Sequence, residues 1–159
     1  MHRIKSLLLL LIIPINYALA TENNNIKISD AWISESPPTV FVLAAYAKIH
    51  NSSNQTQTLT SISSPSFEKI ELHLSKVIND VAKMEKQNSF SIPENSSLEL
   101  TPGAYHLMLF NPESPLEIGD TVPLTFNFSD NTSYTTQAVV KKRNTNDHEH
   151  NHDHHNHHH

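Results

Sequence analysis

The chain contains no cysteine, only two glycines and no long apolar run beyond its first residues. Without cysteine it can be neither a lipid-anchored lipoprotein nor a disulfide-stapled domain. Two isolated glycines, Gly103 and Gly119, cannot form a phosphate-cradling loop, and no nucleophile stands beside a base. The formal net charge of -5 argues against nucleic acid as a partner. We therefore predict no catalytic residues and no enzymatic turnover.

The apolar run near the start of the chain is typical of a secretory signal peptide. Residues 7–13 are apolar, follow the basic residues 1–5, and precede the small-residue pattern Ala18-Leu19-Ala20. The run is well short of the roughly 20 residues that span a bilayer, which argues against a membrane anchor. We expect cleavage of residues 1–20 before Thr21 and export of a soluble protein with no stable membrane insertion.

The rest of the chain, residues 21–143, is long enough for one domain with its own core. No window has a sustained helical period, and short runs rich in aromatic and β-branched residues occur throughout. Strands are predicted over residues 40–49, 69–77, 121–128 and 134–140, with turn signals between them. Many short strands at this spacing predict an all-β fold, an antiparallel sandwich or barrel.

The sequence TPGAYHLMLF, residues 101–110, presents two soft donors within an otherwise apolar strand. Side chains two residues apart on a strand share a face, so His106 and Met108 project together. Tyr105, Leu107 and Leu109 point to the other face and can be buried. An imidazole nitrogen therefore lies beside a thioether sulfur.

Few other residues could complete such a site. Outside the leader and the C-terminal tail, the histidines are His50, His73 and His106, and the methionines are Met84 and Met108. If the chain turns near residues 78–80, His73 and Met84 lie roughly opposite each other on a hairpin. This pair and the pair on the later strand could then converge at one end of a barrel, whereas His50 is predicted to be a surface residue.

The spacing of His73, Met84, His106 and Met108, H-x10-M-x21-H-x-M, resembles the signature of the PCuAC family of periplasmic copper chaperones. Segments such as Asp30-Ala31-Trp32 and Glu71-Leu72-His73 are also similar, and the resemblance spans residues 26–142. It implies a cupredoxin-like Greek-key β-barrel and a periplasmic location. It further implies delivery of copper to the CuA site of cytochrome c oxidase subunit II, alone or with a Sco-type protein.

The donor types themselves favour one ion. Cu(I) is soft and accepts thioether and imidazole ligands without planar geometry, whereas zinc and Cu(II) gain little from methionine. Two histidines and two methionines are therefore predicted to select Cu(I). Thioethers also resist oxidation better than thiolates and release metal more readily, which suits a carrier.

The final segment, residues 144–159, is polar and rich in histidine and is predicted to be disordered. Its imidazoles, interleaved with acidic residues, form a potential secondary site for Cu(II), Zn(II) or Ni(II). Its longest histidine run is three, which favours a native tail over a purification tag. The tail would capture Cu(II) near the barrel. Its histidines are His148, His150, His152, His154, His155, His157, His158 and His159.

Other functions remain open. Storage or buffering of divalent zinc, nickel or copper, mainly through the tail, is the leading alternative. A merely structural β-domain would use the methionines as core filler. A blue-copper electron-transfer protein would share the fold, but its usual form requires a cysteine thiolate that this chain lacks.

Overall fold

The computed structural model describes residues 25–35, 37 and 39–142. The predicted signal peptide, the edges of the predicted domain and the histidine-rich tail lie outside these residues. Within the described part of the chain, no helix is long and apolar enough to cross a membrane. The structure there consists of strands joined by turns. The ten strands are β1 (Ile26–Ser34), β2 (Val42–Asn51), β3 (Gln57–Ser63), β4 (Phe67–Ile78), β5 (Val81–Gln87), β6 (Phe90–Ile92), β7 (Ser96–Leu100), β8 (Tyr105–Pro112), β9 (Thr121–Phe128) and β10 (Ser133–Lys141).

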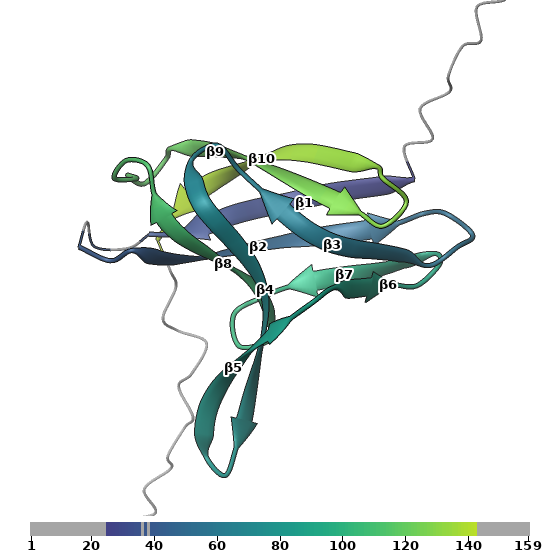
Figure 1. Cartoon of the computed structure of the whole chain (residues 1–159), viewed down its shortest axis with the longest axis horizontal. Coiled ribbons are helices and arrows are strands. Elements are labelled where there is room, and N and C mark those ends of the chain that lie inside the picture. Colours follow the sequence, from purple (N-terminus) through teal and green to yellow (C-terminus); the bar gives the residue numbers. More distant parts are fainter. Residues whose placement is uncertain (1–24, 36, 38, 143–159) are drawn as a thin grey trace, which may run out of the picture.

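The strands form one sheet in the order β5-β4-β8-β2-β1-β10-β9-β3-β6, and β7 also pairs with β2 (Figure 1). The β1–β10 pair is parallel, whereas the other pairs are antiparallel. β7 and β8 share one edge of β2, because β7 pairs with its second half and β8 with its first half. The predicted all-β single domain is confirmed.

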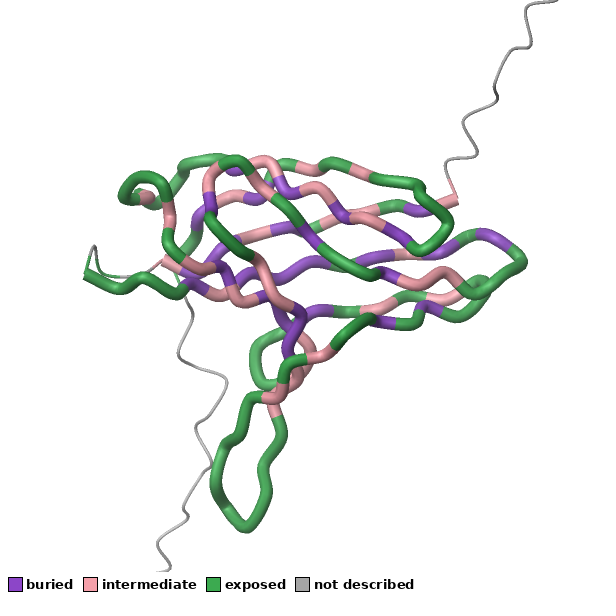
Figure 2. Tube along the Cα trace, in the orientation of Figure 1, coloured by how far each residue is buried: buried purple, intermediate pink, exposed green. Residues whose placement is uncertain are grey.

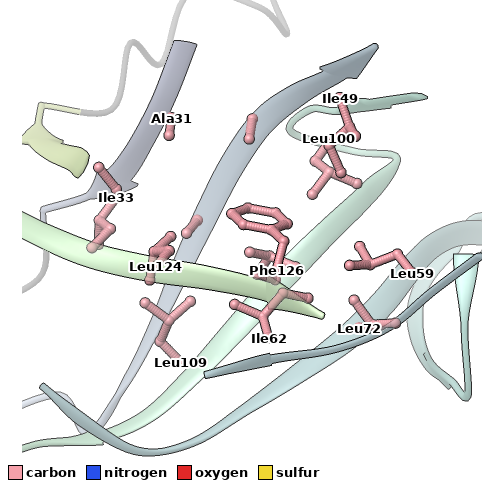
Figure 3. Packing of buried hydrophobic residues seen from close by; sticks show 14 of the residues in the cluster. Ala31, Ile33, Ile49, Leu59, Ile62, Leu72, Leu100, Leu109, Leu124 and Phe126 are labelled. Atoms are coloured by element: carbon pink, nitrogen blue, oxygen red, sulfur yellow. The ribbon is translucent and has the colours of Figure 1, made fainter. Parts of the chain in front are cut away.

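One hydrophobic core holds the sheet together, and it draws residues from nearly every strand (Figure 3). Strand β9 shows how the sequence pattern produces it. Val122, Leu124, Phe126 and Phe128 are buried while the residues between them are more accessible, as their alternation predicts. Burial of each large apolar side chain contributes roughly 1.5–3 kcal/mol to the folding free energy.

Strands β4 and β5 form a hairpin that extends away from the rest of the sheet (Figure 1). Asn79 and Asp80 connect them and have φ angles of 52° and 59°. Positive φ at two central residues is typical of the type I′ turn, whose twist matches that of the flanking strands. Asparagine and aspartate tolerate this left-handed conformation better than most residues. The outer part of the hairpin is exposed, as Figure 2 shows.

A tight turn separates β7 from β8. Gly103 has a φ of 80°, a conformation that glycine adopts without steric cost. Hydrogen bonds from Ala104 N to Thr101 O and from Thr101 N to Tyr105 O close the turn. The Ala104 carbonyl also accepts a hydrogen bond from Ser75 N of β4, 3.0 Å away. The turn is therefore tied to the hairpin at the point where β8 begins.

Candidate metal centre

His73 and His106 stand directly opposite each other on the paired strands β4 and β8. Their ring centroids lie 5.8 Å apart with an interplanar angle of 42°. The residues are only 9% and 4% exposed, which is unusual for polar side chains. Leu72 and Leu107, their chain neighbours, point to the opposite face and pack in the core. The sheet therefore brings together two imidazoles that are far apart in the sequence.

Each imidazole donates one hydrogen bond to a fixed acceptor. Nδ1 of His106 lies 3.0 Å from the Ala104 carbonyl oxygen. Nε2 of His73 lies 3.0 Å from Oε2 of Glu71. The other nitrogen of His73, Nδ1, is buried and has no hydrogen-bond partner among the described residues. A buried polar atom of this kind is costly unless it binds something, so it indicates a ligand position.

Met108 lies on the same face of β8 as His106 and is partly buried. Beside these two residues is a cavity of about 420 Å³, which Met84 of β5 also lines. Strand β2 contributes residues 42–44 and Tyr46 to its lining, and the turn contributes Gly103. Three of the four predicted ligands therefore border one cavity, and the fourth, His73, lies against the ring of His106.

The hairpin register differs from the predicted one by two residues. Met84 pairs with Ser75, whereas His73 pairs with Lys86. Since the offset is even, His73 and Met84 still share a face, but they are diagonal neighbours with typical separations of about 7–8 Å. The two residues were predicted to lie roughly opposite each other, and they share a face as predicted but are displaced from each other by two residues along the hairpin. The type I′ turn has two central residues, Asn79 and Asp80, and this loop length determines the register of the hairpin.

The convergence of the two pairs at one end of a barrel stays a prediction. The four residues lie on the face of the β5-β4-β8 strands that points away from the core. The reason is the alternation of each strand. Leucines occupy the inner face of β4 and β8, so the residues between them must project outward. The candidate centre is therefore accessible from the outer surface of the sheet through the cavity.

Glu71 is a component of the site that the sequence pattern did not identify. Its carboxylate accepts hydrogen bonds from His73, from Lys86 at 2.7 Å and from Lys69 at 3.2 Å. The Lys86 ammonium, followed by the hydrogen bond from His73 and the Lys69 ammonium, lowers the pKa of Glu71 to about 2 despite its partial desolvation. Its position two residues before His73, on the same face of the strand, was the available signal.

The candidate centre combines histidine with methionine rather than with other histidine, cysteine or carboxylate ligands. Among the described residues, no three side chains drawn from histidine, cysteine, aspartate and glutamate gather at a potential metal site. A centre at this position with more than two protein ligands would therefore use the methionine sulfurs in addition to the two histidines. His50 lies elsewhere, with its Nδ1 3.0 Å from the Ser97 hydroxyl. It takes no part in the centre.

The chain is similar to known proteins in both sequence and fold. The chain is 29% identical over 119 residues to "Putative lipoprotein Lxx21020" of Leifsonia xyli subsp. xyli, covering 74% of this chain and 70% of the relative. The structure "Copper-bound PCuAC domain from PmoF2" matches with a TM-score of 0.63 and 20% identity, covering 75% of this chain and 94% of that one. The predicted cupredoxin-like fold is confirmed by this likeness.

A second solved structure is more similar in sequence. The "Solution structure of CuI-DR1885 from Deinococcus radiodurans" is 28% identical, with a TM-score of 0.59, and the match covers 71% of this chain and 76% of that one. The family model described as "Putative lipoprotein LpqE-like" matches residues 26–140, a range that includes the whole candidate centre. The chain belongs to the LpqE-like family.

Proposed function

We propose that this protein is a copper chaperone that carries Cu(I) on His73, Met84, His106 and Met108. The observation that carries the proposal is the buried cross-strand pair of imidazoles, with Met108 beside it and Met84 on the same cavity. The similar Deinococcus radiodurans structure is named as a Cu(I) form, and the PmoF2 domain is named as copper-bound. Copper is the cargo here and no reaction is catalysed.

The chemistry of the four donors supports Cu(I) over other ions. Imidazole nitrogen and thioether sulfur suit a soft ion, and the neutral donor set leaves the charge of the ion uncompensated, which favours a single positive charge. Thioethers hold copper less tightly than thiolates do. Because Met84 is 63% exposed, an acceptor protein can reach this side of the centre first. A site with one accessible ligand is suited to transfer of the ion.

The location and the acceptor are further parts of the proposal. The predicted signal peptide and the lipoprotein names of the family and of the Leifsonia xyli relative support export to the cell envelope, which we propose is the periplasm. The domain itself would span residues 21–143. By the PCuAC resemblance, the acceptor would be the CuA site of cytochrome c oxidase subunit II, reached alone or with a Sco-type protein.

The histidine-rich residues 144–159 would serve as a separate capture site. Their imidazoles suit Cu(II), which prefers nitrogen donors, and their attachment to the domain raises the local copper concentration. An external one-electron reductant would have to convert the captured Cu(II) to Cu(I) before the ion enters the candidate centre, because the chain has no cysteine thiol to supply the electron. The same composition favours the second candidate function, storage of divalent zinc, nickel or copper by the tail.

An anaerobic Cu(I) titration against a calibrated chelator tests the proposal. The proteins are residues 21–159, the same chain ending at Arg143, and the Met84→Leu, Met108→Leu double variant of each. We expect one tightly bound Cu(I) in both lengths of the wild-type chain and its loss in the double variants. His50→Gln is the matched control, because this histidine lies outside the centre.

The same proteins separate the two candidate functions. If the tail stores metal, divalent metal binding should be lost when residues 144–159 are removed. It should be unchanged in the Met84→Leu, Met108→Leu double variant. A truncated chain that binds no Cu(I) would refute the chaperone proposal. Unchanged Cu(II) stoichiometry after truncation would refute the role of the tail.

A further inference from the structure

Resting on the proposed function, we infer that Glu71 is a positioning residue that determines which nitrogen His73 offers to copper. The hydrogen bond between Nε2 of His73 and Oε2 of Glu71 is 3.0 Å long, and the two groups share one face of β4. A carboxylate can only accept, so Nε2 must carry the hydrogen. In a neutral imidazole the lone pair then lies on Nδ1.

The surroundings of Glu71 maintain this role. The carboxylate is only 12% exposed, and its other oxygen, Oε1, accepts from Lys86 and Lys69. Two ammonium groups on one oxygen keep the residue ionised and leave Oε2 directed at His73. Glu71 and His73 lie on β4, whereas Lys86 lies on β5. The β4–β5 register, in which Lys86 stands opposite His73, therefore determines the arrangement. Glu71 is thus built into the sheet.

The unprotonated nitrogen of His73 is in a position to bind an ion. Nδ1 is buried and makes no hydrogen bond to any described residue. The ring of His106 stands 5.8 Å away between centroids, which leaves room for one ion between the rings, since metal–imidazole bonds are about 2.0–2.1 Å long. Copper would therefore bind Nδ1 of His73.

His106 has the opposite tautomer, and a backbone acceptor rather than a side chain determines it. Its Nδ1 donates to the Ala104 carbonyl, a backbone acceptor that also receives the amide of Ser75. Its lone pair is therefore on Nε2. The centre would thus combine Nδ1 of one histidine with Nε2 of the other. Only the first of these choices depends on a side chain that mutation can change, so His106 serves as an internal reference.

The test is nitrogen-15 NMR of the histidine rings, which distinguishes protonated from unprotonated nitrogens. The sample is the copper-free chain 21–159, with His73 and His106 assigned from His73→Gln and His106→Gln. We expect hydrogen on Nε2 of His73 and on Nδ1 of His106. Glu71→Gln, whose amide can either donate or accept, should mix or reverse the tautomer of His73 and leave that of His106 unchanged.

Matched variants separate this role from a general loss of charge. Glu85→Gln removes a carboxylate of the same hairpin that binds Lys76 and does not contact either histidine. Lys86→Gln removes a partner of Glu71 but retains the acceptor. Both variants should preserve the tautomer of His73. A His73 with hydrogen on Nδ1 in the wild-type chain, or an unchanged tautomer in Glu71→Gln, would overturn the inference.

Addition of Cu(I) completes the experiment. Nδ1 of His73 and Nε2 of His106 should shift on loading, and Glu71→Gln should weaken Cu(I) binding about 10–100-fold, as is usual when the partner of a ligating histidine is lost. Binding of copper through Nε2 of His73 would refute the inference while preserving the proposed function. Absence of Cu(I) binding in the wild-type chain would refute the proposed function, and the copper-free spectra would still decide the role of Glu71.

Discussion

In the candidate centre, the two buried imidazoles and the exposed thioether of Met84 belong to differently built parts of the molecule. His73 and His106 are 9% and 4% exposed and stand on strands that pair along most of their length. Met84 is 63% exposed and stands on β5, an edge strand of the sheet. In the proposed centre, the imidazoles would therefore be held in place before copper binds. Met84 would have to lose side-chain freedom on binding copper, which would cost up to about 1.5–2 kcal/mol.

This difference suggests a division of roles within one site. The buried pair would determine the geometry of the proposed centre, because hydrogen bonds to Ala104 and Glu71 orient its rings. The exposed thioether of Met84 would give an acceptor access to the ion, because it could release the ion without any change in the sheet. A carrier needs both properties, since it must select copper and then release it.

The largest expected effect concerns the stability of the paired strands themselves. Leu107→Ala removes a fully buried side chain from the core behind His106 and should cost about 2–5 kcal/mol of unfolding free energy. Val77→Ala, on the exposed part of the hairpin, should change it by less than about 0.5 kcal/mol. Urea denaturation measures both. Equal losses of unfolding free energy in the two variants would contradict the contrast between the buried β4–β8 strand pair and the exposed hairpin.

Removal of the nitrogen ligands should have the next largest effect. His73→Gln or His106→Gln should weaken Cu(I) binding by more than about 100-fold, a larger loss than is typical for residues that only orient a ligating histidine. Chelator competition under anaerobic conditions measures this change. His50→Gln should bind as the wild-type chain does. If either buried histidine can be replaced without loss of affinity, the imidazole pair is not the centre.

A smaller change is expected for the exposed methionine. Met84→Leu should weaken Cu(I) binding about tenfold, equivalent to about 1.4 kcal/mol, because its contribution is offset by the ordering of the side chain. Its unfolding free energy should stay within about 0.5 kcal/mol of the wild type, since Met84 is exposed. Met108→Leu should have a larger effect on binding. The reverse ranking would contradict the proposed division of roles.

The smallest effect is the pH dependence that Glu71 contributes. Its pKa is about 2 in the folded chain, lowered first by Lys86, compared with an ordinary value of 4.5. The stabilisation is therefore fully present above pH 4.5 and is lost as the pH falls towards 2. Glu71→Gln should be less stable than the wild type near neutral pH, and this difference should narrow over that acidic range. Chemical denaturation at several pH values measures it, and a constant difference would argue against the ion pairs.

Several features were predictable from the sequence because they depend on local backbone geometry. The bounds of β9 agree with the predicted strand, and the faces of His106, Met108 and their leucine neighbours follow from a period of two. The Asn79-Asp80 turn was also predicted. Strands β3, β6 and β7 were not predicted, because they are short or polar and gain their structure from pairing with neighbours.

Strand β1 shows a further limit of sequence patterns. The register between β1 and β2 shifts between Ser29 and Trp32, and Asp30 has a φ of 53°. Such a bulge adds a residue to one strand and interrupts the alternation from which a strand is predicted. The contacts of Glu71 were not predicted for a similar reason. Its partners Lys86 and His73 meet only because β5 pairs with β4 in one particular register.

The sequence alone determined the chemical nature of the donors, the sides of the strands on which they project and the site of the hairpin turn. Each of these depends on residues that are close in the chain. Only the tertiary structure decided that β4 lies beside β8, that His73 therefore faces His106, and that Met84 remains exposed. Pairing between distant strands depends on how the whole core packs, so no short stretch of sequence contains it.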